Sequence, residues 1–191
     1  MDIFKKHYSR KGIWLIFSAS VVPIHVWTFI LFFRDFTWIS ERTNLWDAFG
    51  VGAYGLLIAL LESAVVTIVA IFMGLIISNK WTEHRRVSLL GILVFACALW
   101  AIIGQLYFMM DIRIPGGWLQ EIARTPHPLW ILYGVSIIVI GVSLLLPTYF
   151  VTREGKFSTM IYKIIESLST LTTLYLFLDL IGLIIIIIRN V

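Results

Sequence analysis

Two acidic residues lie alone inside long apolar stretches of the chain. Glu62 is near the centre of residues 49–77, and Asp179 is near the centre of residues 168–188. A carboxylate at the middle of a bilayer is strongly disfavoured unless it is protonated, hydrated or paired. Since two carboxylates in a low-dielectric interior cannot both be comfortably ionised, such a pair could relay protons or bind a cation. We expect both acids at similar depth, where they are candidates to meet.

Small and weakly polar residues accompany both acids at spacings of three and four, which lets helices approach closely. They are Ala59, Ser63, Thr67, Ala70 and Gly74 around Glu62, and Ser169, Thr172 and Gly182 around Asp179. These stripes predict that both helices turn the acids towards or beside a bundle core. Two other interpretations stay open. A protonated acid could lock helix packing through a hydrogen bond, or an acid could pair with a basic residue of another subunit, because this chain has none at that depth.

His25 and Gln105 complete the candidate intramembrane polar site. Haem ligation by two histidines would need a second histidine in the membrane, and the others fall in polar segments: His7, His84 and His127. We therefore expect a neutral, hydrogen-bonded His25 beside a proline kink. Gln105 is expected to turn its amide towards the bundle.

Charged residues follow two of the apolar stretches and suggest an ion-pair cluster outside the membrane. Arg34 and Asp35 end the first stretch, and Asp111 and Arg113 end the third. A guanidinium matches the geometry of a lipid phosphate, so this cluster is a candidate lipid-headgroup site. Interfacial anchoring is the simpler interpretation of the same residues.

Motifs for catalysis and cofactor binding are missing from the sequence. There is no Walker-type phosphate loop, no His-Glu-x-x-His pair, no Gly-x-Ser-x-Gly elbow and no Cys-x-x-Cys pair. The single cysteine, Cys97, excludes an intrachain disulfide and a cysteine-rich metal site. We therefore predict no catalytic residue, no metal and no cofactor, and a non-enzymatic role is favoured.

The composition places these residues in a membrane protein. Hydrophobic residues make up 60% of the 191 residues and charged residues only 14%, which lies outside the range of soluble domains. Crossing a bilayer takes about 20 apolar residues as helix. Five stretches qualify: 12–33, 49–77, 87–110, 129–150 and 168–188. Because the runs are continuous rather than alternating, we predict an all-α, polytopic transmembrane helical bundle that forms one integral membrane domain over residues 1–191.

The positions of Lys and Arg predict the orientation. Of the 15 Lys and Arg residues, ten fall in the N-terminal segment and in the second and fourth connections, and five fall on the opposite side. The positive-inside rule then places the N-terminus in the cytoplasm and the C-terminus outside. Because the basic residues form short flanking groups without a continuous face, no nucleic-acid partner is expected. The external connections 34–48 and 111–128 are predicted to form a small cap, with a short helix around Trp118.

These patterns favour one function and leave two alternatives. The favoured role is a multi-pass plasma-membrane protein that serves as a non-catalytic subunit or accessory factor of a larger membrane system, in contact with membrane lipids and other subunits. One alternative is a small transporter or channel, with or without proton coupling, that uses Glu62 and Asp179. The other is an outer-face protein that binds lipids or modifies their headgroups.

Overall fold

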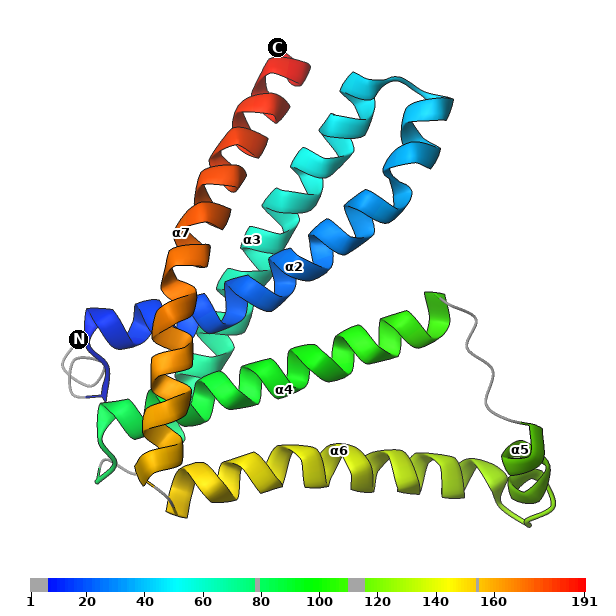
Figure 1. Ribbon diagram of the computed structural model, residues 1–191, viewed down its shortest axis with the longest axis vertical. Coiled ribbons are helices and arrows are strands. Elements are labelled where there is room, and N and C mark those ends of the chain that lie inside the picture. Colours follow the sequence, from blue (N-terminus) through cyan, green and yellow to red (C-terminus); the bar gives the residue numbers. More distant parts are fainter. Residues whose placement is uncertain (1–6, 78–79, 110–115, 154) are drawn as a thin grey trace.

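The computed structural model describes residues 7–77, 80–109, 116–153 and 155–191, and these residues are almost entirely helical. Figure 1 shows the helices, which are α2 (Arg10–Arg42), α3 (Leu45–Ile76), α4 (Glu83–Met109), α5 (Gly116–Ala123), α6 (Pro128–Arg153) and α7 (Gly155–Asn190). All except α5 are long and apolar enough to cross a membrane. The predicted all-α bundle of five membrane-length helices is confirmed.

Several helices extend beyond the apolar stretches that predicted them. The helix α2 continues through the charged residues of the predicted first connection, and only Thr43 and Asn44 separate it from α3. Asn44 caps α3 because its side chain accepts a hydrogen bond from the backbone N–H of Asp47. In the same way, α7 begins at Gly155 rather than near residue 168. Charged residues end an apolar run, but most of them are compatible with a helix, so the helix itself continues.

The predicted cap is not formed by the described residues. The short helix expected around Trp118 is present as α5, but Figure 1 places it at the far end of α6, well away from the α2–α3 turn. Residues 34–48, the other predicted half of the cap, instead belong mainly to the ends of α2 and α3. Residues 34–48 therefore extend α2 and α3, whereas α5 lies beside α6.

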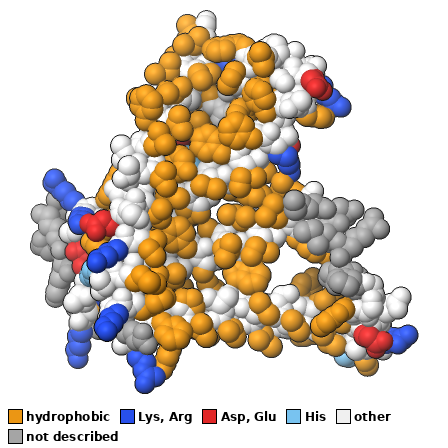
Figure 2. All heavy atoms as spheres, viewed as in Figure 1, with side chains coloured by type: hydrophobic (Ala, Val, Ile, Leu, Met, Phe, Trp, Pro, Cys, Tyr) orange, Lys and Arg blue, Asp and Glu red, His pale blue; other side chains and the backbone are white. Residues whose placement is uncertain are grey.

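Figure 1 shows that the helices converge at one end and diverge from it. We call this end the base; α2, α4 and α7 begin there, and α3 and α6 end there. From the base, α2, α3 and α7 run together as one arm, while α4 and α6 form a second arm that leans away. Figure 2 shows charged side chains gathered near helix ends, with a broad apolar surface between them. This distribution suits helices whose middle parts lie in lipid.

The main core lies at the base and draws on every long helix. It includes Leu15 and Ile16 of α2, Val87 of α4, Val151 of α6 and Ile165 of α7, each 1% exposed or less. Val151 is the only residue of α6 that is buried, so the rest of that helix contributes little to the core. Between lipid-embedded helices such contacts stabilise through close packing rather than through exclusion of water.

Polar contacts also hold the base together. The backbone N–H and hydroxyl of Ser9, which precedes α2, donate to Oε1 of Glu83 on α4 at 2.7 and 2.6 Å. The Tyr8 hydroxyl donates to the carbonyl of Ile71 on α3 at 3.2 Å. Burial raises the pKa of Tyr8 to about 12, against an opposing contribution from the nearby Arg86. Tyr8 and Ser9, just before α2, thus contact α3 and α4.

Candidate functional site

A deeply buried polar contact joins α2 to α7. His25 is fully buried and Asp179 is 2% exposed. The Nε2 atom of His25 lies 3.0 Å from Oδ1 and 3.2 Å from Oδ2 of Asp179. Asp179, expected as a partner for Glu62, therefore pairs with His25.

The hydrogen bonds fix how many protons this pair holds. Nδ1 of His25 lies 2.9 Å from the carbonyl oxygen of Val21. A carbonyl only accepts hydrogen bonds, so Nδ1 must carry a hydrogen and donate it. The contact between Nε2 and the carboxyl group then needs one proton, carried either by the imidazole or by Asp179. In both arrangements the net charge of the pair is zero, which suits an apolar interior.

Close packing around the pair comes from one face of α7. Tyr175, one turn before Asp179, stacks on the His25 ring with centroids 5.1 Å apart and planes inclined by 17°. Gly182 lies on the same face, where a Cβ atom would be 3.3 Å from the carbonyl oxygen of Ala53 on α3. The face of α7 that carries Asp179 thus packs against α2 at His25 and against α3 at Ala53.

Glu62 occupies a different environment from Asp179. The small residues at spacings of three and four along α3 are all buried, as predicted: Ala59, Ser63, Thr67, Ala70 and Gly74. Glu62 immediately precedes Ser63, and one residue turns an α-helix by about 100°. The carboxylate therefore lies beside the packed face rather than on it, and its side chain is exposed. It forms no hydrogen bond or ion pair with the residues that the structure describes.

A groove between α2, α3 and α4 contains Glu62. Its volume is about 330 Å³, and most of its lining is apolar. Gln105 of α4 lies in the same lining, is exposed, and has no polar partner within the described ranges. Trp27 of α2 is 9% exposed, and its indole N–H is buried without an acceptor in the described part of the chain. Two of the predicted polar residues, Glu62 and Gln105, thus line one groove, and His25 and Asp179 do not.

Arg34 and Asp35, predicted for an external cluster, form an ion pair near the groove. Nε and Nη2 of Arg34 donate to the two carboxylate oxygens of Asp35 at 2.6 and 2.7 Å. Both side chains are about half exposed, and Asp35 also lines the groove. The other two predicted members of the cluster, Asp111 and Arg113, lie outside the described residues.

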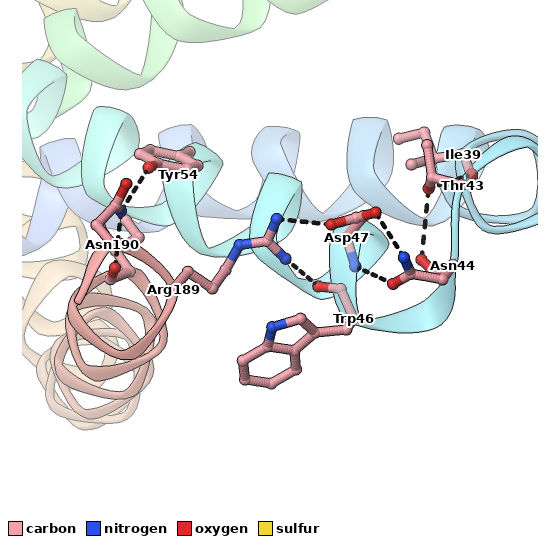
Figure 3. Close-up of polar contacts among 9 residues, drawn as sticks. Ile39, Thr43, Asn44, Trp46, Asp47, Tyr54, Arg189 and Asn190 are labelled. Atoms are coloured by element: carbon pink, nitrogen blue, oxygen red, sulfur yellow. Dashed lines mark hydrogen bonds and ion pairs between the residues drawn. The ribbon is translucent and has the colours of Figure 1, made fainter.

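A polar contact that the sequence did not predict joins the end of α7 to the start of α3. Figure 3 shows Arg189 between these helices: Nη2 donates to Oδ1 of Asp47 at 2.7 Å and Nη1 to the carbonyl of Trp46 at 2.5 Å. Next to it, the amide of Asn190 donates to the Tyr54 hydroxyl at 3.0 Å. A cation at a helix C-terminus and an acid at a helix N-terminus are both favoured by the helix dipoles. The sequence did contain a signal, because the last turn of α7 is basic, the first turn of α3 is acidic, and the two helix ends were expected on the same side of the membrane.

The arrangement offers little for catalysis. Both ring nitrogens of His25 are engaged, one by a backbone carbonyl and one by Asp179, so the imidazole has no free position for a substrate. Nucleophilic catalysis needs a nucleophile beside such a base and a place for the substrate, and no such arrangement is formed by the pair. The groove has the opposite character, because two of its polar side chains, Glu62 and Gln105, are exposed and have no partner among the residues that the structure describes.

Comparison with known proteins assigns this chain to no family. No protein-family model, curated protein or solved structure matches this chain. The functional conclusion therefore depends on the geometry of the two polar regions.

Proposed function

We propose that this protein is a non-catalytic subunit or accessory factor of a larger membrane assembly. The observation that carries the proposal is the exposed carboxylate of Glu62 at the middle of α3, without a partner among the residues described. Lipid chains cannot satisfy such a group, and its transfer into the bilayer is costly. A neighbouring membrane component that contacts this surface would remove that cost.

The separation of the two acids supports this role over transport. A carrier or channel that used both acids would place them along one polar path. Here Asp179 is enclosed with His25 between α2 and α7, whereas Glu62 lies in the groove between α2, α3 and α4. Asp179 therefore stabilises the contact between α2 and α7, whereas Glu62 is available for a contact with another molecule.

The distribution of Lys and Arg supports the proposed topology. We place the base on the cytoplasmic side of the plasma membrane, because the connections richer in Lys and Arg lie there. The α2–α3 turn and the C-terminus then lie on the opposite side. The groove opens from the middle of the bilayer towards that side, so its partner is a membrane-embedded component.

Isolation from the native membrane tests this proposal. The full chain carrying a small affinity tag would be extracted in a mild detergent, and its mass measured by light scattering and native mass spectrometry. We expect a complex with another membrane protein at a fixed ratio that persists through two chromatographic steps. A strictly monomeric chain that brings no protein with it would overturn the proposal.

A further inference from the structure

We infer that the groove between α2, α3 and α4 receives a transmembrane helix of a different polypeptide, and that this helix carries an arginine at mid-depth which pairs with Glu62. The inference rests on the proposed function, because it names the contact that a partner subunit makes. Its starting point is the pair of unpartnered, exposed side chains, Glu62 and Gln105, in one otherwise apolar groove.

The position of Glu62 sets the depth of the partner's charge. At a rise of 1.5 Å per residue, Glu62 is about 21 Å from the base end of α3 and about 26 Å from its other end. A bilayer core is about 30 Å thick, so the carboxylate lies far from either interface. A long basic side chain that remains near a headgroup cannot reach it, and the positive charge must come from the middle of a helix.

The charge balance of the groove calls for one cation. Asp35 is the other acid in the lining, and Arg34 already neutralises it through two hydrogen bonds. Glu62 therefore remains as the single uncompensated acid of this lining. A guanidinium pairs with a carboxylate through two parallel hydrogen bonds and keeps further N–H groups for an amide oxygen such as that of Gln105. Arginine fits both unpartnered groups better than lysine does.

A second copy of this chain cannot supply that charge. None of the five apolar stretches contains a Lys or Arg, and the basic residues all lie in the segments between them or at the chain ends. Two copies placed side by side would bring carboxylates together at mid-depth, where they repel each other unless protonated. The occupant is therefore a different polypeptide.

The length of the groove favours a helix over a small organic cation. Its lining runs from Trp27 to Ile39 on α2 and from Val51 to Glu62 on α3, which corresponds to about 16–18 Å at 1.5 Å per residue. It is an open groove along two helices, reached by α4 at Gln105, rather than an enclosed cavity. Sites for small molecules usually enclose most of the ligand surface. An elongated apolar groove with one charge suits the side of a helix that carries one opposite charge.

Designed transmembrane peptides test the inference directly. The full-length protein, labelled with a donor dye, would be reconstituted in phosphatidylcholine vesicles with an acceptor-labelled polyleucine helix that has one central arginine. A second peptide with leucine at that position is the matched control. Energy transfer should show at least tenfold tighter association of the arginine peptide, and Glu62→Gln should abolish the difference. Glu121→Gln, which removes an exposed acid on α5, should leave it unchanged.

A charge exchange separates a specific pair from a general electrostatic effect. The Glu62→Arg variant should no longer bind the arginine peptide, and it should bind a peptide with a central glutamate. Circular dichroism of each variant shows whether the helices are retained. If Glu62→Arg fails to fold, the comparison of Glu62→Gln with wild type still decides the outcome.

Three results with the peptides and with tetraphenylphosphonium would overturn the inference. The first is equal binding of the arginine and leucine peptides, and the second is arginine-peptide binding that Glu62→Gln does not weaken. The third is Glu62-dependent binding of tetraphenylphosphonium that the arginine peptide does not displace, since the groove would then be a small-cation site. A native partner that still co-purifies with Glu62→Gln would reject this contact and leave the proposed function standing. A wild-type chain that co-purifies with no other membrane protein would reject the proposed function itself.

Discussion

Two regions of this molecule each hold an acid in the middle of an apolar helix, and they treat it in opposite ways. In the packed region, where α2, α3 and α7 meet, Asp179 is buried against His25 and Tyr175 stacks on the ring. In the open region, the groove between α2, α3 and α4, Glu62 is exposed and makes no polar contact with described residues. The same side-chain chemistry thus serves internal packing in one place and is available for binding in the other.

The difference follows from what faces each acid. Asp179 meets a helix that offers a histidine, so its hydrogen bonds are completed inside the chain. Glu62 meets the open side of the groove, because the α4–α6 arm leans away from α2 and α3 (Figure 1). Intramembrane charge is therefore not by itself a sign of transport here. The two regions predict opposite responses to mutation.

The largest effect is expected at Asp179. Asp179→Ala leaves the buried imidazole of His25 without its partner, which should lower the free energy of unfolding by about 1–3 kcal/mol. Unfolding by titration with sodium dodecyl sulfate in mild detergent, followed by circular dichroism, measures the loss. If the contact is a true pair, removing His25 as well should cost less than the sum of the two single changes. Strictly additive losses would contradict the pairing.

The next largest difference is expected between substitutions at a glycine of the packed region and at a glycine of α4. Gly182→Leu adds a side chain against the backbone of Ala53 in the packed region, and overpacking of this kind costs about 1–3 kcal/mol. Gly104 on α4 has nothing within 4 Å of an added Cβ atom, so Gly104→Ala should be neutral or stabilise by up to about 1 kcal/mol. The same detergent titration compares the two variants. Equal losses would show that the second arm packs as tightly as the first.

A smaller effect is expected where the packed region ends. Arg189→Leu removes the contacts of α7 with Asp47 and Trp46, and we expect a loss of about 0.5–1 kcal/mol because the pair is partly exposed. Arg124→Leu, which breaks an exposed ion pair at the end of α5, serves as the control and should leave stability unchanged. If Arg124→Leu lowered the free energy of unfolding as much as Arg189→Leu does, the contact between α3 and α7 would contribute no more than an exposed ion pair.

The base, where the helices of both regions converge, should respond to alkaline pH through Tyr8. Burial raises the pKa of Tyr8 from its ordinary value of 10.0 to about 12 in the folded chain, so the protonated hydroxyl favours folding. Its contribution is complete below about pH 10 and is lost as the pH rises through about 12. The stability difference between wild type and Tyr8→Phe should therefore shrink over that interval, when both are titrated in parallel. A difference that stays constant up to pH 12 would argue against the burial of the Tyr8 hydroxyl.

Much of the fold could be predicted from the sequence because lipid imposes simple rules on helices. Continuous apolar runs indicated the five long helices, and the spacing from Ala59 to Gly74 indicated the buried face of α3. Helix ends were harder to predict, because Arg34 follows the first apolar run and Lys163 precedes the fifth, yet both lie inside a helix.

The partner of Asp179 was harder still to predict. Whether it meets Glu62 or His25 depends on how α2, α3 and α7 rotate about their axes, and a single residue of rotation turns Glu62 away from the core. The contact of Arg189 with Asp47 likewise requires knowing which helix ends are neighbours. Periodicity along one helix gives its buried face, but it does not give the helix that covers that face.

The most direct test of the central claim measures the stability of Glu62→Ala and Asp179→Ala side by side in the same detergent. The opposite roles of the two acids predict that Asp179→Ala loses more than about 1 kcal/mol, whereas Glu62→Ala changes the free energy of unfolding by less than about 0.5 kcal/mol. Similar losses in the two variants, or a larger loss at Glu62, would contradict the assignment of Asp179 to the fold and of Glu62 to binding.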